Sequence, residues 1–323
     1  MARITEVRVD EPERILEEAA ARQRRTRLTS GGRLVIAAAD HPGRLVTAAA
    51  GDPLAMSNRR HYLARVLRVL TQAEVDGVMS TPDLIEELLI LSSLMRERRG
   101  SSFLDGKILM GCMNRGGLAG ARFEMLDRFT AFQAAQLKKM GLDAGKLMFR
   151  LDLSNQGSGT TIYDCSEALR ELEQHGLPAF LEPLAVELRD GKYKVTKTAE
   201  ALAKVIGVAT ALGNSSRLLW LKVPYVADYS RVAASTTCPM LMLGGGSRND
   251  PQEVLGEFAA GLAAGSNVRG VLVGRNVLFP AQADPAAMAG AIAGLVHRRL
   301  GVDEAAKLFQ KGLEQPSPAP FEI

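Results

Sequence analysis

The 323-residue chain contains little cysteine and few aromatic residues: it has three cysteines and one tryptophan, and Phe, Trp and Tyr together make up 5%. Cys112, Cys165 and Cys238 are far apart and form no CxxC pair, so the sequence predicts neither a disulfide framework nor a zinc–thiolate site. The four histidines show no HxH or HExxH spacing, which argues against a zinc-dependent hydrolase or aldolase. We therefore expect chemistry that needs no metal and no dissociable cofactor, in a reducing compartment.

Charge and hydropathy argue against two further classes of protein. The 40 basic and 36 acidic residues give a formal net charge of +4, and the chain has no dense lysine or arginine tract of the kind that binds nucleic acid. No apolar run reaches the ~18 residues of a membrane span, and the N-terminal segment lacks the apolar core of a signal peptide. The sequence indicates a cytoplasmic protein with neither nucleic-acid nor membrane partners.

Eight short apolar runs divide the chain into units of similar length. They begin near residues 34, 76, 107, 146, 178, 217, 239 and 268. The mean spacing, about 33 residues, is that of one strand, one helix and their loops. Continuously apolar strands separated by amphipathic helices are typical of a buried parallel sheet. The pattern predicts a single domain over 1–323 whose core, about 33–300, is a (β/α)8 TIM barrel.

A doubly wound open sheet is the alternative architecture. Its phosphate loop usually follows the first strand as GxGxxG, whereas this position reads ADHPGR. Outside the barrel we expect one N-terminal helix over about 11–27, and a C-terminal helix followed by a proline-rich tail. Within the barrel, the stretch EMLDRFTAFQAAQLKKMG at 124–141 predicts one of the outer helices.

Polar residues late in the predicted strands identify the candidate site, because the chemistry of such barrels lies at the carboxyl ends of the strands. Lys222 is the most informative, since it interrupts the apolar run LLWLKVPYV. Burial favours the neutral amine, and a neutral lysine can attack a carbonyl to form a Schiff base. The structural alternative is a lysine that reaches solvent or pairs with a carboxylate.

Two glycine-containing turns follow the seventh and eighth strands, where barrels commonly bind phosphate. The first reads GGGS and includes Gly245, Gly246 and Ser247, and the second includes Gly274 and Arg275. Glycine lets the backbone approach an anion closely, and a helix expected to begin near 249–252 adds its dipole. The hydroxyl and the guanidinium supply further contacts. We expect a phosphate site here.

The other polar strand ends carry candidate proton-transfer and substrate-binding groups. Asp40 ends the first strand and Glu182 lies in the fifth, and either carboxylate can transfer protons. In the fourth strand, alternation within FRLDLS places Arg150 and Asp152 on the same side. In the functional interpretation, these two residues form an ion pair or bind substrate hydroxyls. In the other they belong to a buried polar layer of the barrel.

These motifs together resemble the class I aldolase superfamily. AAADHP in the first strand, WLKVPY in the sixth, and LGGGS with GVLVGRNV in the last two are similar to archaeal-type fructose-bisphosphate, tagatose-bisphosphate and deoxyribose-phosphate aldolases. The resemblance implies a Schiff base on Lys222, an acid/base role for Asp40, a functional glutamate at Glu182, and phosphate binding by the two turns. It also implies a homo-oligomer. One departure is the fourth strand, where those relatives carry a lysine or tyrosine near the reacting carbons and this chain offers FRLDLS.

The sequence thus predicts a lyase that works through a lysine Schiff base on a phosphorylated ketose or keto-acid. The chain also resembles a deoxyribose-phosphate aldolase-like branch associated with inositol breakdown, and this resemblance implies 2-deoxy-5-keto-gluconate 6-phosphate as the substrate. A phosphosugar isomerase or epimerase on the same barrel is the first rival, and it would use carboxylates without a covalent adduct. A non-catalytic sugar-phosphate sensor is the second, and it requires an exposed Lys222. A transaldolase is a close variant of the predicted aldolase, since it also works through a lysine Schiff base.

Overall fold

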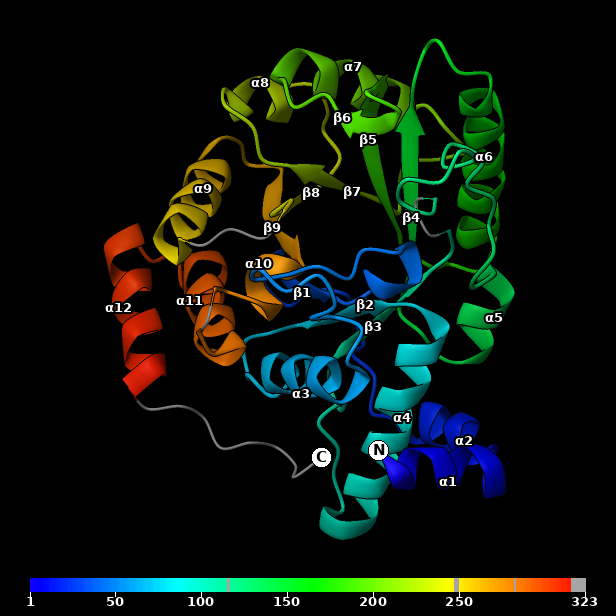
Figure 1. Ribbon diagram of the computed structural model, residues 1–323, viewed down its shortest axis with the longest axis vertical. Helices are drawn as coiled ribbons and strands as arrows, with labels where there is room; N and C mark the ends of the chain where they lie inside the picture. The colour runs from blue at the N-terminus through cyan, green and yellow to red at the C-terminus, as the bar shows by residue number, and fades with distance from the viewer. Residues whose placement is uncertain (115–116, 247–249, 282, 315–323) are drawn as a thin grey trace.

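A computed structural model describes residues 1–114, 117–246, 250–281 and 283–314 of the chain. Eight parallel strands form a closed barrel (Figure 1). In spatial order they are β1 (Leu34–Ala38), β2 (Gly77–Ser80), β3 (Ile108–Cys112), β4 (Ala144–Leu151), β5 (Ala179–Arg189), β7 (Leu219–Pro224), β8 (Met240–Leu243) and β9 (Val268–Val273). Pairing of β9 with β1 and of β4 with β5 completes the ring. The predicted (β/α)8 barrel is confirmed.

Helices surround the barrel on the outside (Figure 1). The longer ones that follow strands are α3 (Arg59–Leu70), α4 (Pro82–Arg99), α6 (Gly157–Gln174), α7 (Ala199–Thr210), α9 (Pro251–Ala263) and α11 (Pro285–His297). The shorter ones are the 3-10 turn η1 (Pro42–Arg44), α5 (Ala134–Lys139), α8 (Tyr229–Ala233) and α10 (Arg275–Leu278). The predicted C-terminal helix is α12 (Val302–Glu314), which packs on α9 and α11, and the expected tail lies outside the described residues.

The barrel interior is apolar at one end and polar at the other. Side chains from six strands fill the apolar part, where Ile36, Ile108, Ala144, Phe180, Leu241 and Leu272 pack in one buried cluster. Successive side chains of a strand alternate between its two faces, so the inward positions two residues further along each strand lie nearer the carboxyl ends. These are the positions where the polar residues of the site occur.

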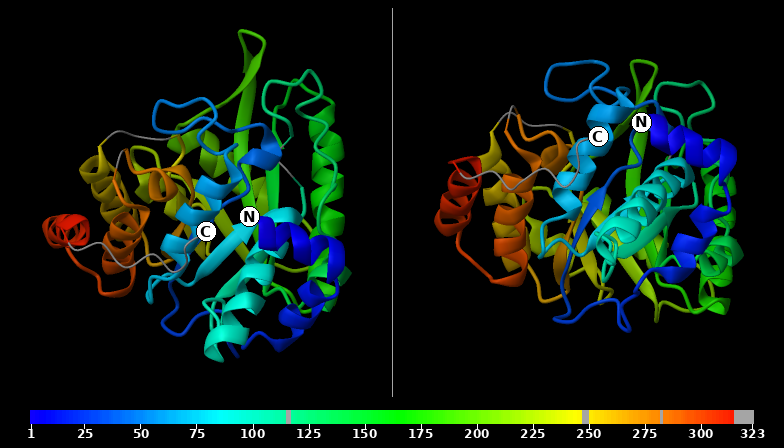
Figure 2. Two further views of the ribbon diagram at one scale, coloured as in Figure 1. Left: turned by 60° about the horizontal axis from the view of Figure 1, so that its bottom comes forward. Right: turned by 90° about the horizontal axis from the view of Figure 1, so that it is seen from below.

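The structure corrects the predicted number of strands. A ninth strand, β6 (Lys192–Val195), pairs antiparallel with the end of β5, with Val186 opposite Val195 and Arg189 opposite Lys192. The turn contains Asp190-Gly191, a dipeptide typical of tight hairpins, and both residues have positive φ. Figure 2 shows this hairpin projecting beyond the rest of the barrel.

Two predicted helices are also corrected. The stretch 124–141 is helical only over α5, because 124–133 belongs to a long loop that crosses toward the mouth of the barrel. The N-terminal segment forms two helices, α1 (Ala2–Asp10) and α2 (Arg14–Ala21), where one was expected. None of the helices in the described part of the chain combines the length and the apolarity that a membrane span needs.

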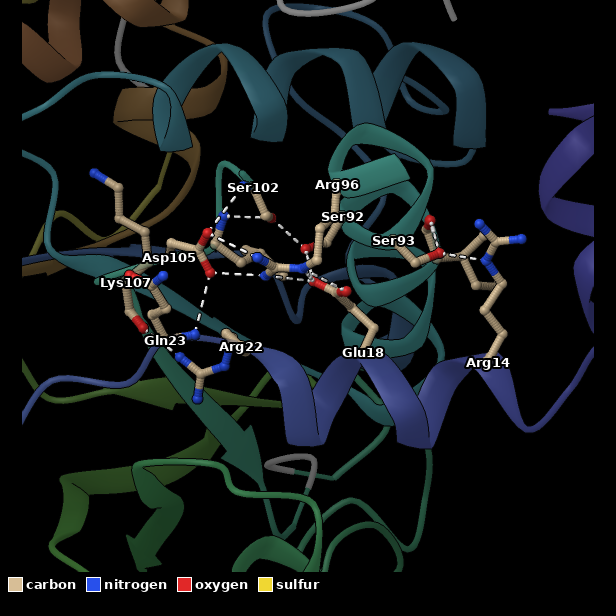
Figure 3. A network of polar contacts seen from close by, with 12 residues as sticks. Arg14, Glu18, Arg22, Gln23, Ser92, Ser93, Arg96, Ser102, Asp105 and Lys107 are labelled. Carbon is tan, nitrogen blue, oxygen red and sulfur yellow. Dashed lines mark hydrogen bonds and ion pairs between the residues drawn. The ribbon is translucent and has the colours of Figure 1, made fainter. Parts of the chain in front are cut away.

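A buried charge network attaches α2 to α4 (Figure 3). Glu18 on α2 is 3% exposed and accepts hydrogen bonds from Arg96, with Nε 3.0 Å from Oε2, and from the hydroxyl of Ser92. Arg96 also donates to Asp105, with Nη2 2.7 Å from Oδ1. Each charge in this trio has an opposite charge beside it, so the network holds the N-terminal helices against the barrel.

Candidate active site

Four buried ionisable side chains from four strands or strand ends meet inside the carboxyl end of the barrel. Lys222 on β7 donates a hydrogen bond to Glu182 on β5, with Nζ 2.9 Å from Oε2. Lys146 on β4 forms an ion pair with the same oxygen at 3.0 Å. Asp40, two residues after β1, lies on the other side of Lys146, with Oδ2 3.8 Å from Nζ. One carboxylate is therefore shared by two lysines, and one lysine lies between two carboxylates.

The register of the strands places these groups near one another, with Lys146 two residues before the partner of Glu182. Lys146 is paired with Cys112 of β3 and with Phe180 of β5, and Glu182 is paired with Met148. Since alternate residues share a face, Lys146 follows inward-facing Ala144 and Glu182 follows inward-facing Phe180. Lys146 has no exposed surface, and Glu182 and Lys222 are 4% and 5% exposed.

The two lysines have opposite electrostatic surroundings. Burial lowers the pKa of Lys222, and the neighbouring Lys146 cation lowers it further, which outweighs the attraction of Glu182. Burial also acts on Lys146, but Glu182 and Asp40 together raise its pKa above the ordinary value. The shared carboxylate stays ionised: burial opposes this, but the two lysines lower the pKa of Glu182 to about 2. The site thus holds one amine whose pKa is lowered beside another whose pKa is raised.

Asp40 and His41 form the β1 side of the site. Burial would raise the pKa of Asp40, but the positive charges of Lys146 and Arg44 hold it well below its usual range. Asp40 Oδ2 has no hydrogen-bond partner among the described residues. His41 Nδ1 lies 3.9 Å from Asp40 Oδ1, and burial lowers the pKa of His41 to about 3, so the imidazole is neutral at pH 7. Asp40 is therefore an ionised acceptor whose Oδ2 faces Lys146 but accepts no hydrogen bond from the described residues.

The turns after β8 and β9 lie side by side, as expected for a phosphate site. Arg275 donates to the carbonyl of Gly245, with Nη2 3.2 Å from O, and Asn276 donates to the carbonyl of Gly244 at 2.8 Å. Gly245 adopts a φ of +67°, which favours glycine. Gly274 is also required, because a Cβ there would lie 2.2 Å from Cε1 of His41.

The remaining predicted parts of this turn are placed as follows. Gly246 is in the described bend, and Ser247 lies outside the described residues. The helix expected near 249–252 is α9, which begins at Pro251 and is capped by Asp250. Sequence reasoning did not single out Lys197, whose Nζ would lie 3.7 Å from a Cβ built on Gly245. An ammonium thus lies close to the glycine turn.

Arg150 and Asp152 are not paired with each other. Arg150 donates to Glu124 in the loop between β3 and α5, with Nη1 2.6 Å from Oε1, and it also contacts the carbonyl of Glu124. Asp152 accepts from the backbone and hydroxyl of Ser154, at 2.9 and 2.7 Å. Both predicted residues are buried. Arg150 binds the loop between β3 and α5, and Asp152 accepts hydrogen bonds within the turn that follows β4. Their binding of substrate stays a prediction.

Lys146 is the site residue that the sequence interpretation missed. The sequence interpretation favours polar residues at strand ends, and in the fourth strand these lie in FRLDLS. However, β4 and β5 pair as far as Leu151 with Ala185 and continue into the projecting hairpin, so the end of β4 lies above the reacting level. The inward residue of β4 whose side chain reaches Glu182 is the third residue of the strand, which is a lysine. The apparent departure from the resembling aldolases is thereby corrected: the fourth strand does supply a lysine.

The geometry supports carbonyl chemistry at an amine. An amine with a lowered pKa, an amine with a raised pKa and two ionised carboxylates within one buried cluster can form an imine and move protons around it. In the described part of the chain, no three His, Cys, Asp or Glu side chains are grouped so that they could hold a metal ion.

Comparisons with known proteins agree with this architecture. The family model described as Cgl0159-like matches residues 32–293. The crystal structure of Cgl0159 from Corynebacterium glutamicum is 36% identical, with 92% of this chain and 96% of that one covered and a TM-score of 0.85. No curated protein matches the chain.

Two aldolase structures are more distant. An archaeal fructose-1,6-bisphosphate aldolase, solved with its catalytic lysine bound to the carbinolamine intermediate, is 19% identical, with 87% of this chain and 99% of that one covered and a TM-score of 0.58. The fructose-bisphosphate aldolase of Slackia heliotrinireducens is 15% identical, with 96% and 93% covered and a TM-score of 0.61. At these identities the likeness shows a shared barrel fold.

Proposed function

Because the chain belongs to the Cgl0159-like family and its barrel has the fold of Schiff-base aldolases, we propose that it is a class I aldolase. The enzyme cleaves or forms a carbon–carbon bond in a phosphorylated ketose or keto-acid. One observation carries the proposal: two buried lysines share a single carboxylate, and the pKa of Lys222 is lowered while that of Lys146 is raised.

Lys222 is the nucleophile in this mechanism. Its neutral amine attacks the ketone of the substrate to give a carbinolamine. Loss of the hydroxyl as water needs a proton, and Lys146, held protonated between Glu182 and Asp40, is the adjacent donor. Glu182 accepts a hydrogen bond from Lys222 and forms an ion pair with Lys146, so it passes protons between the two lysines. The product of these steps is an iminium on Lys222.

The iminium withdraws the electron pair of the bond to be cleaved. A base removes the proton of the substrate hydroxyl, the carbonyl of the aldehyde product forms, and the electrons of the broken carbon–carbon bond enter an enamine on Lys222. Asp40 is suited to act as this base, because its Oδ2 is buried and has no hydrogen-bond partner among the described residues. Glu182 is less suited, since it already contacts both lysines. Protonation of the enamine and hydrolysis release the second product.

The phosphate of the substrate rests on the β8 and β9 turns in this proposal. Gly245, Gly246, Gly274 and Arg275 line the described part of that site, and Ser247 completes the predicted motif. The carbonyl carbon then lies toward Lys222, which is on the strand next to β8.

Borohydride trapping tests the proposal. We would treat the whole protein with borohydride in the presence of dihydroxyacetone phosphate, fructose 1,6-bisphosphate, tagatose 1,6-bisphosphate or 2-deoxy-5-keto-gluconate 6-phosphate, then measure its intact mass and map the modified peptide. An adduct on Lys222 is expected, and its mass identifies the donor. Lys222→Met should lose the adduct and lower turnover by at least about 10⁴-fold. Lys204→Met, which removes an exposed lysine from α7, is the matched control and should keep both the adduct and the turnover.

The outcomes separate the rival functions. An adduct on Lys146 in place of Lys222 would reverse the two assigned roles. The absence of any adduct, with isomerisation of a phosphosugar observed, would replace the aldolase by an isomerase or epimerase that uses Asp40 and Glu182. A two-substrate assay distinguishes an aldolase from a transaldolase. The exposed Lys222 that a sugar-phosphate sensor requires is contradicted, since Lys222 is 5% exposed.

A further inference from the structure

Apart from Lys146 Nζ, which forms ion pairs with Glu182 and Asp40, three side-chain nitrogens at the mouth of the barrel are buried and lack hydrogen-bond partners. They are Nδ1 of His41, Nε of Arg44 and Nε of Arg275, and none has a partner among the described residues. His41 and Arg44 follow β1, and Arg275 follows β9, which is the neighbour of β1 in the barrel. Buried donors are normally paired, so this group needs an explanation that the described residues do not supply.

Arg44 is the most unusual of the three. Its guanidinium donates no hydrogen bond and forms no ion pair in the described ranges of the chain, although the residue is half-buried. Arg22 provides a contrast, because its Nε is also unbonded but both terminal nitrogens donate, Nη1 to Lys107 and Nη2 to Gly141 and Asp143. A largely covered cation with no partner costs free energy.

The backbone holds Arg44 in place. The carbonyl of His41 accepts from the amides of Arg44 and Val46, at 3.0 and 3.1 Å. The amide of Ala119, from the loop between β3 and α5, donates to the carbonyl of Arg44 at 3.1 Å. Leu45 adopts a φ of +60° without being a glycine, a costly conformation that the surrounding contacts maintain. The unpartnered guanidinium therefore belongs to a fixed turn.

Arg44 and Arg275 affect each other electrostatically. After burial, the charge of Arg44 is the main cause that lowers the pKa of Arg275, ahead of the opposing effect of Asp40. His41, whose pKa both arginines also lower, touches the β9 end because Gly274 leaves room for its ring. The two guanidinium groups repel each other, and an anion that contacts both would replace this repulsion by attraction to each of them.

We propose that Arg44, His41 and Arg275 together hold one phosphate group, with Arg44 acting as a second arginine opposite the β8 and β9 turns. A phosphate monoester suits these donors better than a carboxylate, because it offers three terminal oxygens and carries nearly two negative charges. This inference rests on the proposed function only in that the phosphate belongs to the substrate. It adds that Arg44, outside the glycine motifs, selects for a dianionic group.

The charge balance of the site agrees with an anionic ligand. Even without counting Lys222, three cations, Lys146, Arg44 and Arg275, face two carboxylates, Asp40 and Glu182. Arg150 does not add to this excess, since Glu124 neutralises it. A ligand with two negative charges more than balances the remaining positive charge, and the low dielectric of the mouth strengthens that attraction.

Isothermal titration calorimetry with inorganic phosphate tests this inference directly. We expect saturable binding to the whole protein. Arg44→Met should weaken it by about 10- to 100-fold, which corresponds to the ~1.5–3 kcal/mol of a hydrogen bond to a charged group. Arg275→Met should weaken it similarly. Arg60→Met, which removes an exposed arginine from α3, is the matched control and should bind as the wild type does.

Three further measurements keep the test decisive. The double variant Arg44→Met with Arg275→Met should lose less than the sum of the two single losses in free energy, because both arginines contact one anion. In phosphate-free buffer Arg44→Met should melt at the wild-type temperature or above it, since the arginine has no protein partner to lose. Arg44→Lys, which retains a point charge, should bind with intermediate affinity and serves if the methionine variant fails to fold.

Two outcomes would overturn the inference. One is unchanged phosphate affinity in Arg44→Met while Arg275→Met binds weakly, and the other is wild-type protein that binds neither inorganic phosphate nor glycerol 3-phosphate. The failure of the aldolase proposal is a separate result, because phosphate binding does not require the amine. Lys222→Met should bind phosphate as the wild type does even if no borohydride adduct forms on any lysine.

Discussion

The charge network between α2 and α4 and the charged mouth of the barrel use the same kinds of residue, but their charges are balanced differently. Glu18, Arg96 and Asp105 alternate in sign, and each touches an opposite charge (Figure 3). At the mouth, two lysines share Glu182 and the guanidinium of Arg44 has no protein partner in the described ranges. The first arrangement is complete without a ligand, whereas the second carries an excess of positive charge.

This difference separates a structural role from a chemical one. In the complete network, the hydrogen bonds to Glu18 and Asp105 raise the pKa of Arg96. The arginine therefore stays protonated and has a structural role. In the incomplete one, Lys146 lowers the pKa of Lys222, so an amine becomes available. Substitutions in the two regions should therefore change different quantities.

Arg96→Met should have the largest effect on stability. It leaves the carboxylate of Glu18, which is 3% exposed, without its cation. Because an unpaired buried charge costs about 3–5 kcal/mol, we expect a loss of about 3 kcal/mol for this partly exposed arginine, measured by urea unfolding. Turnover per folded molecule should stay at the wild-type value.

The control for this variant lies on the same helix. Arg98→Met removes an exposed arginine from α4 and should change stability by no more than about 0.5 kcal/mol. If the Arg96 variant were as stable as the Arg98 variant, the network would not hold the N-terminal helices.

Lys146→Met should have the next largest effect, which is on activity rather than on stability. Its loss removes the cation that lowers the pKa of Lys222 and leaves Glu182 to Lys222 alone, and both changes raise that pKa. Since the amine must be deprotonated to react, the acid limb of kcat/KM should move to higher pH. At neutral pH the value should fall by about 10- to 100-fold.

The pH profile distinguishes this role from a structural one. Lys146→Arg keeps the charge and should leave the acid limb near its wild-type position. A methionine variant with lower activity but an unmoved acid limb would show that Lys146 does not set the pKa of Lys222.

The fold could be predicted from the sequence because buried parallel strands are continuously apolar. The hairpin was missed because β5 was taken to end with its apolar run, although ELRDGKYKV contains a turn dipeptide and an alternating strand. The helix expected over 124–133 does not form, since this segment is held over the mouth by Arg150 and cannot be assigned from local periodicity. The conformation of such segments depends on contacts with residues far away in the sequence.

The candidate site was predicted in part for a related reason. Lys222, Asp40 and Glu182 were found because a charge within or just after a short apolar strand is conspicuous. Lys146 begins an apolar run and looked like a flanking residue. Its position inside the barrel follows from the pairing of β4 with β5, which no residue of β4 reveals alone. Arg44 lies in a loop, and only its missing partner identifies it.

Glu124→Gln should have the smallest effect and addresses the predicted role of Arg150. Glu124 accepts from Arg150 and, through Oε2, from the amide of Gly120 at 2.9 Å, so it ties the loop between β3 and α5 to β4. Weakening this tie by about 1 kcal/mol should raise KM by about fivefold with little change in kcat. Steady-state kinetics on the substrate identified by trapping would measure it, with Glu167→Gln as the surface control.

Comparison with Arg150→Met decides what the arginine does. If Arg150 acts only by holding the loop, its removal should raise KM about as much as Glu124→Gln, because both variants break the same ion pair. If Arg150 also binds substrate, as the sequence predicts, its removal should raise KM by at least a further tenfold, since a hydrogen bond to a charged group contributes about 1.5–3 kcal/mol. The ratio of the two KM values therefore separates a loop-holding residue from a substrate-binding one at this strand end.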